Sequence, residues 1–80
     1  MDISENLVTT EKLAKLLGVS VATVNYYTNL GLFTVHDRKG NARLYDKREM
    51  VSIFEEIQQL RREGYSLKLI HQKLEKGYNM

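Results

Sequence analysis

The sequence predicts a mainly α-helical fold of four helices, with a small two-stranded β-hairpin between the second helix and the third. Two observations support this prediction. Apolar residues recur at three- and four-residue spacing in four separate stretches, each bounded by a capping residue or a glycine. Between the second and third stretches, two runs that favour β-structure flank a Gly-Asn turn.

Length and composition allow one small domain. Eighty residues form a modest core, so we expect residues 1–80 to be a single unit with its core over 7–76. The sequence contains no cysteine, and His36 and His71 alone are too few for a structural zinc site, so we expect no metal and no cofactor. Without a long apolar run or a signal-like N-terminus, it reads as a cytoplasmic protein of bacterial type that makes no membrane contact.

A short amphipathic helix opens the central stretch, residues 13–32, around which the chain is organised. Either Thr9 or Thr10 can cap its N-terminus. Gly18 follows its last turn, where a left-handed C-cap favours glycine. Three leucines at helical spacing form its predicted inward face: Leu13, Leu16 and Leu17.

A second helix is predicted over residues 21–30, with Ser20 as its N-cap and Gly31 after its end. Because only Gly-Val-Ser separates the two helices, they predict a helix-turn-helix, and in DNA-binding versions the second helix lies in the major groove. Val24, Leu30 and one of two adjacent tyrosines can face inward. The outer face is polar but uncharged, so it suits base edges and phosphates better than water alone. Its residues are Ala22, Thr23, Asn25, Tyr26, Thr28 and Asn29.

Residues 34–45 are predicted to form the hairpin, which beside a helix-turn-helix makes a winged helix-turn-helix. Its β-favouring runs are 32–36 and 42–45. The hairpin is basic, through Arg38, Lys39 and Arg43. Such a tip either contacts phosphate or is a solvated turn, because turns favour the same residue types.

The third helix has the clearest start in the chain, because Asp46 and Glu49 form a pair like a capping box. Gly64 ends it, and Ser66 caps a fourth helix that ends near 76–77. Both helices have one apolar face. These faces consist of Met50, Ile53, Phe54, Ile57 and Leu60 in the third helix and Leu67, Ile70 and Leu74 in the fourth.

The chain resembles the N-terminal domain of MerR-type transcriptional regulators. The resemblance begins with the helix-turn-helix run LAKLLGVSVATVNYYTNLGLF and continues through RLY at 43–45. It ends with RREGYSLKLIHQKL, which is similar to that family's R-x-x-G-[FY]-S-L-x-x-I element. It covers residues 7–74 and implies a winged helix-turn-helix that binds double-stranded DNA, with the helix at 21–30 in the major groove and the wing on the backbone.

The resemblance also implies roles for individual residues. Asn25 stands where relatives usually carry a DNA-facing arginine, and Ala22 where they often carry a basic phosphate contact. Arg43 and Tyr45 match the wing's Arg-x-Tyr, and one or both tyrosines of the pair meet the backbone. The candidate DNA-binding residues are Ser20, Ala22, Thr23, Asn25, Tyr26, Tyr27, Arg38, Lys39, Arg43 and Tyr45.

Two of these candidates could read bases. Asn25 can pair with adenine N6 and N7, worth ~1–3 kcal/mol of discrimination, or it can meet only a phosphate or water. Thr23 could touch a thymine methyl or a phosphate. Because the cationic contacts are fewer than in relatives, we expect binding that is weaker, and less steeply dependent on salt, than that of a typical relative. Relatives dimerise through a long helix that would follow Met80, so we expect a homodimer on DNA through a segment outside this chain.

Two other functions fit the same fold. The domain could be an excisionase-like architectural factor that bends DNA, or a protein-interaction module that uses the surface near Tyr26, Tyr65 and Tyr78. Salt separates DNA from protein partners, because only phosphate binding must weaken steeply as salt rises. An enzyme is not expected, since the sequence offers no nucleophile, no glycine-rich phosphate loop and no convincing carboxylate pair.

Overall fold

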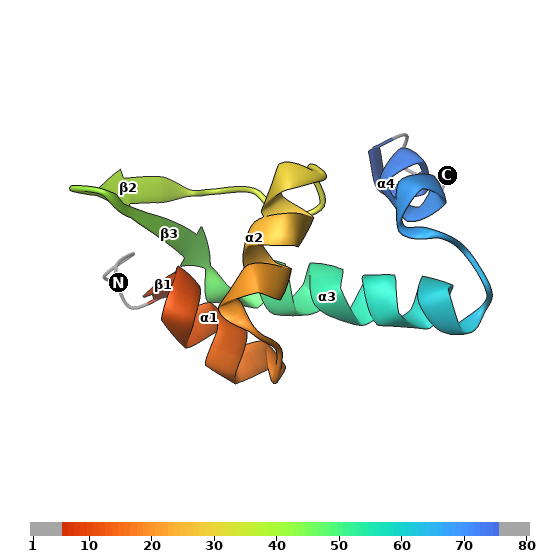
Figure 1. The fold of residues 1–80 in the computed structure, drawn as a ribbon, viewed down its shortest axis with the longest axis horizontal. Coiled ribbons are helices and arrows are strands. Elements are labelled where there is room, and N and C mark those ends of the chain that lie inside the picture. The colour runs from red at the N-terminus through yellow and green to blue at the C-terminus, as the bar shows by residue number, and fades with distance from the viewer. Residues whose placement is uncertain (1–5, 76–80) are drawn as a thin grey trace.

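A computed structural model describes residues 6–75 and has the predicted architecture, a mainly α winged helix-turn-helix (Figure 1). Helix α3 runs along the long axis, α1 and α2 lie across its first half, and the wing projects at one end (Figure 1). The elements in order are β1 Leu7–Thr9, α1 Thr10–Leu17, α2 Val21–Asn29, β2 Asp37–Lys39, β3 Ala42–Asp46, α3 Lys47–Arg62 and α4 Leu67–Glu75. The expected helix end near 76–77, core residue 76 and Tyr78 lie outside the described residues.

Side-chain caps fix the start of each helix. Of the two candidates for α1, Thr9 is the cap, and its hydroxyl accepts from the Lys12 backbone N–H at 3.3 Å. Ser20 accepts from Thr23 N–H at 3.1 Å to start α2. Asp46 Oδ1 accepts from Glu49 N–H at 3.0 Å to start α3, as the sequence predicts. In each case the side chain satisfies an N–H that has no partner within the helix.

The sheet contains a strand that the sequence did not predict. Besides the hairpin pair, β1 pairs antiparallel with β3, which gives the strand order β1-β3-β2. In this register Val8 lies opposite Tyr45, and both are buried. A three-residue strand has too little alternation to be recognised from sequence alone.

The first strand of the wing starts later than predicted, at Asp37 instead of within 32–36. The backbone N–H groups of Leu32 and Phe33 donate to Tyr27 O, at 2.9 and 3.2 Å, at the end of α2. Both side chains are buried. This segment therefore closes the helix and fills the core, and the strand begins only after it.

The core lies between α3 and the other elements. Tyr27 packs edge-on against Phe33, with ring centroids 5.3 Å apart, and also approaches Phe54 at 6.4 Å. The prediction of Leu16 as an inward residue is wrong, because its side chain is 53% exposed while Leu13 is fully buried. The core residues are Val8, Leu13, Ala14, Val24, Tyr27, Leu32, Phe33, Tyr45, Met50, Ile57, Leu60 and Ile70.

Helix α4 returns over α3 and reaches the end of α2. Its Ile70 is buried, and His71 lies against Gly31, where an added Cβ would be 2.8 Å from His71 Nε2. Gly31 has φ +87°, a backbone angle that residues other than glycine rarely adopt. Within residues 6–75, no helix has the length and apolarity needed to cross a membrane, and no cluster of acidic and histidine side chains could hold a metal.

Candidate nucleic-acid interface

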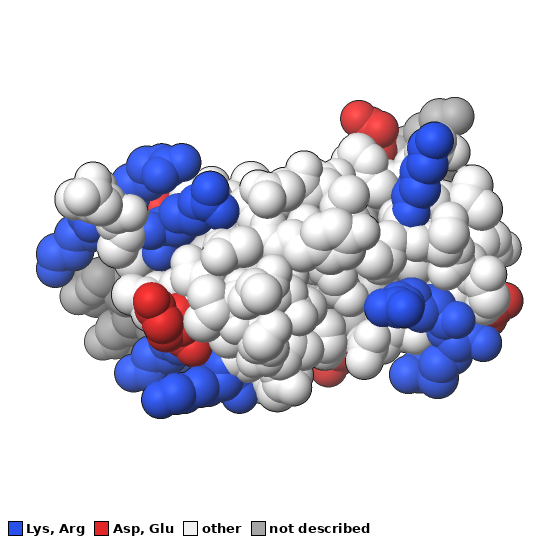
Figure 2. Space-filling view, in the orientation of Figure 1, with Lys and Arg blue, Asp and Glu red and all other residues white. Residues whose placement is uncertain are grey.

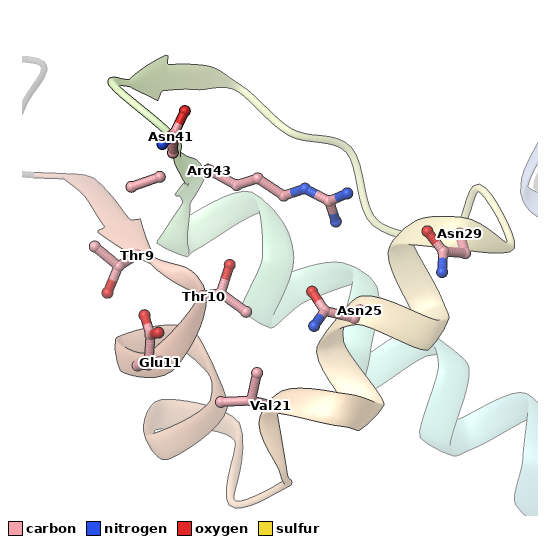
Figure 3. A pocket seen from close by; sticks show the side chains of 9 residues that line it. Thr9, Thr10, Glu11, Val21, Asn25, Asn29, Asn41 and Arg43 are labelled. Atoms are coloured by element: carbon pink, nitrogen blue, oxygen red, sulfur yellow. The ribbon is translucent and has the colours of Figure 1, made fainter.

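A hollow of about 480 Å³ separates α2 from the wing and is closed at its base by the start of α1 (Figure 3). Figure 3 shows the Arg43 side chain extending from β3 towards α2, where Asn25 and Asn29 lie. The hollow therefore brings together one cation, the carboxylate of Glu11 and several uncharged hydrogen-bonding groups. Its lining residues are Thr9, Thr10, Glu11, Val21, Asn25, Asn29, Asn41, Ala42 and Arg43.

The wing presents two arginines on one face. Arg38 and Arg43 are cross-strand partners in the hairpin, so their side chains leave the sheet on the same side. Like charges directly opposite each other destabilise a hairpin unless something else compensates. An anion between the two guanidinium groups would supply that compensation. Lys39 is opposite Ala42 and so leaves from the other face.

A tight turn holds the two wing strands in register. Gly40 and Asn41 connect them, and Gly40 has φ +61°, while no non-glycine residue in 6–75 has a positive φ. A glycine with positive φ at the first central position is typical of a type II′ hairpin turn, whose twist matches that of the strands. The turn thereby fixes which side chains share a face with Arg43.

Several candidates on α2 already have protein partners. The hydroxyls of Ser20 and Thr23 lie 2.9 Å apart at the helix start, so both belong to the cap. Thr28 was expected on the outer face, but it is half-buried, and its Oγ1 donates to Val24 O at 2.9 Å. Ala22 is exposed, and Asn25 is half-buried at the wall of the hollow.

The two adjacent tyrosines have different environments. Tyr27 is the inward one, only 5% exposed, and Arg61 Nη1 approaches its hydroxyl at 3.5 Å. Tyr26 is 53% exposed. The expectation of a DNA contact therefore stays with Tyr26, because the Tyr27 ring is enclosed by Phe33 and Phe54.

The placement of Tyr45 contradicts its expected role as a surface contact. Its side chain is fully buried, and its hydroxyl lies 2.8 Å from Thr28 Oγ1. Since the Thr28 proton is directed to Val24 O, the tyrosine hydroxyl is the donor in this pair. Tyr45 thus ties the wing to α2 and sets the geometry of the hollow from inside.

The structure also shows candidates that sequence reasoning missed. Thr10, expected only as a possible cap, lines the hollow from α1 beside Asn25 and Asn29 of α2. Figure 2 shows Lys and Arg at both ends of the same face, with a largely uncharged surface over α2 between them. The second group lies at the end of α3, where Arg61 reaches Tyr27 of α2 and Arg62 is exposed. Only the fold brings these cations to the side of α2.

A capped helix-turn-helix whose second helix and basic wing border one polar hollow defines a winged helix-turn-helix DNA-binding domain. Comparison with known families agrees, because residues 8–77 match the family described as MerR HTH family regulatory protein. The chain therefore belongs to the MerR family of DNA-binding transcription regulators. Searches among curated proteins and among solved structures find no significant match.

Proposed function

We propose that this domain binds double-stranded DNA sequence-specifically, with α2 in the major groove and the wing, residues 34–45, along the adjacent backbone. The main support is the hollow, where Arg43 of the wing and Asn25 of α2 face the same space. A cation there can neutralise a phosphate while the amide reaches a base edge.

The dimensions and surface of α2 support this docking. With its side chains an α-helix is about 10–12 Å in diameter, which fits the B-DNA major groove of ~12 Å, and the nine residues of α2 extend for roughly 14 Å. The uncharged face of α2 lies between two basic groups, at the wing and at the end of α3 (Figure 2). Cations on both sides of a neutral helix fit a duplex whose phosphates flank the groove. In this arrangement Arg38 and Tyr26 join Arg43 on the backbone, Lys39 adds positive charge from the other face of the wing, and Ala22 and Thr23 face the groove.

Specific regulation would require two copies of the domain. With so few cationic contacts, one copy should bind near the nonspecific range, ~10⁻⁴ to 10⁻⁶ M at physiological salt. Two copies related by a two-fold axis would read half-sites about 34–36 Å apart on one face of the duplex. We therefore expect a homodimer on DNA and a pseudopalindromic operator.

Replacing Arg43 by alanine is expected to weaken binding to all duplexes about equally. The loss of one phosphate contact should also lower the slope of log K against log[salt] by about one. Fluorescence anisotropy of a random-sequence duplex, titrated at two salt concentrations, measures both quantities. Unchanged affinity and slope in the alanine variant would remove Arg43 from the interface.

The variant Arg43→Lys is the matched control for charge. Lysine keeps the cation but lacks the planar fork that pairs with two phosphate oxygens. We expect it to bind less tightly than wild type while it keeps the wild-type salt slope. If no duplex binds any of the three proteins even at low salt, the DNA role itself is wrong and the protein-interaction function takes its place.

Replacing Asn25 by alanine is expected to relax preference at one base pair by about 1–3 kcal/mol, because a bidentate amide contact is lost. Asn29→Ala removes the same group one turn along α2, beyond the N-terminal part that reads bases. Because Asn29 lines the same hollow, its loss should weaken binding equally for all sequences and leave the preference profile unchanged. Selection from a random duplex library with each protein yields the two profiles. An equal loss at every sequence for Asn25→Ala would make Asn25 a backbone contact.

A further inference from the structure

A second hollow, of about 390 Å³, lies where α1 meets the first half of α3. It shares no lining residue with the hollow beside the wing. Its apolar lining residues are Leu16, which is 53% exposed, and half-buried Val51. Its remaining lining residues are Lys47, Arg48, Ser52 and Glu55, all from α3.

The charges on this stripe of α3 are divided by sign. Lys47, Val51 and Glu55 follow each other at intervals of four residues and so lie along one face of the helix. Arg48 adds a second cation at the start of the stripe. Positive charge thus marks one end and negative charge the other, with the apolar residue midway between them. At about 1.5 Å per residue, each charged end lies ~6 Å from Val51 along the helix axis.

We propose that this face of α1 and α3 binds the same face of a second copy of the chain. If a two-fold axis passes beside Val51, the two α3 helices run antiparallel, and Lys47 of each copy faces Glu55 of the other. Because a two-fold contact uses the same patch twice, each opposite-charge pair forms on both sides of the axis. The two Val51 side chains meet at the centre, and Leu16 of each copy covers them from the side.

A parallel arrangement is ruled out by the same charges. It would place Lys47 beside Lys47 and Glu55 beside Glu55, and like charges across an interface are repulsive. A complementary surface needs an apolar centre with negative charge opposite Lys47 and positive charge opposite Glu55. A second copy in the antiparallel orientation has this pattern already, whereas an unrelated partner would need to have evolved it. The pattern therefore selects a second copy and one orientation.

The hollow is small compared with a standard interface, which buries about 800 Å² on each partner. We therefore expect self-association only at high protein concentration, roughly 0.1–1 mM, a range that corresponds to weak complexes. Sedimentation equilibrium of the chain without DNA measures it directly. Because no DNA is present, the result does not depend on the function proposed above.

Charge reversal provides a specific test. In K47E/R48E, glutamates face Glu55 of the other copy, and in E55K, lysine faces Lys47 and Arg48. Each variant alone should therefore self-associate at least about tenfold more weakly than wild type, since attractive pairs become repulsive on both sides of the axis. When the two variants are mixed in equal amounts, opposite charges face each other again, so a heterodimer should form with about wild-type affinity.

The matched control is Glu56→Lys, which makes the same charge change one residue along α3, at the hollow beside His71 instead of this face. We expect it to self-associate like wild type, and circular dichroism should show that all variants remain helical. A wild-type chain that stays monomeric at 1 mM would overturn the proposal. So would variants that dimerise as well as wild type, or a mixture that fails to restore the dimer.

Discussion

Replacing Tyr45 by alanine is expected to remove a large share of the protein's free energy of unfolding. The side chain is fully buried opposite Val8 of β1, and removal of a large buried ring costs about 3–5 kcal/mol. At roughly 0.05–0.15 kcal/mol per residue, a chain of this length has only ~4–12 kcal/mol of stability. The substitution also removes the hydrogen bond to Thr28 that joins the wing to α2. Urea unfolding followed by far-ultraviolet circular dichroism measures the loss.

The variant Tyr45→Phe separates packing from the hydrogen bond. It keeps the ring, so it should cost only about 0.5–1.5 kcal/mol, and Thr28 can still donate to Val24 O. If the alanine variant lost no more than the phenylalanine variant, the ring would not be held in the core as described.

Replacing Gly31 by alanine is expected to destabilise the fold for two separate reasons. Its φ of +87° costs a side-chain-bearing residue about 1–2 kcal/mol. The new Cβ would also lie 2.8 Å from His71 Nε2, so the imidazole must move aside, which adds a cost of up to about 1–3 kcal/mol. The urea midpoint should therefore fall well below that of wild type.

Two further variants separate these causes. Gly40 has φ +61° but nothing within 4 Å of an added Cβ, so Gly40→Ala should show the backbone cost alone. In a His71→Ala background, the cost of Gly31→Ala should drop to that of Gly40→Ala, because the clash is gone. A double-mutant cycle that shows no coupling between Gly31 and His71 would mean that α4 does not pack on the end of α2 as the structure has it.

Local signals in the sequence were enough to predict most of the helices and the hairpin. Ser20, Asp46 and Ser66 start α2, α3 and α4 because a side-chain oxygen can satisfy the first N–H groups of the helix wherever it occurs. The Gly-Asn pair at the wing turn predicted the hairpin, since glycine at its first position provides the backbone that the turn needs. Each of these signals acts within three or four residues.

Features that depend on distant residues could not be predicted. Strand β1 exists only because β3, almost forty residues later, offers it a partner. Leu32 and Phe33 favour β-structure locally, yet their backbone N–H groups bond to the end of α2 and their side chains fill the core. Leu16 fits the helical apolar pattern of α1 but is 53% exposed, because so short a helix covers the core with only part of its face.

The same division applies to the site. Arg43 and Asn25 could be proposed from residue type and resemblance, and the structure brings them to one hollow. Tyr27, and not Tyr26, fills the core because it packs against Phe33 and Phe54. No local sequence pattern predicts where those two rings lie. Arg61 reaches α2 only because α3 crosses beneath it, thirty-four residues along the chain.

The strand order β1-β3-β2 leaves the short strand β2 at an open edge of the sheet, with all three of its residues exposed. An open edge offers unpaired backbone groups to the strands of other molecules and is a common starting point for aggregation. Here that edge is three residues long and consists of Asp37, Arg38 and Lys39, whose charges oppose the addition of another strand. The residues proposed to meet phosphate therefore also keep concentrated protein from associating through its sheet, which favours contact through helices instead.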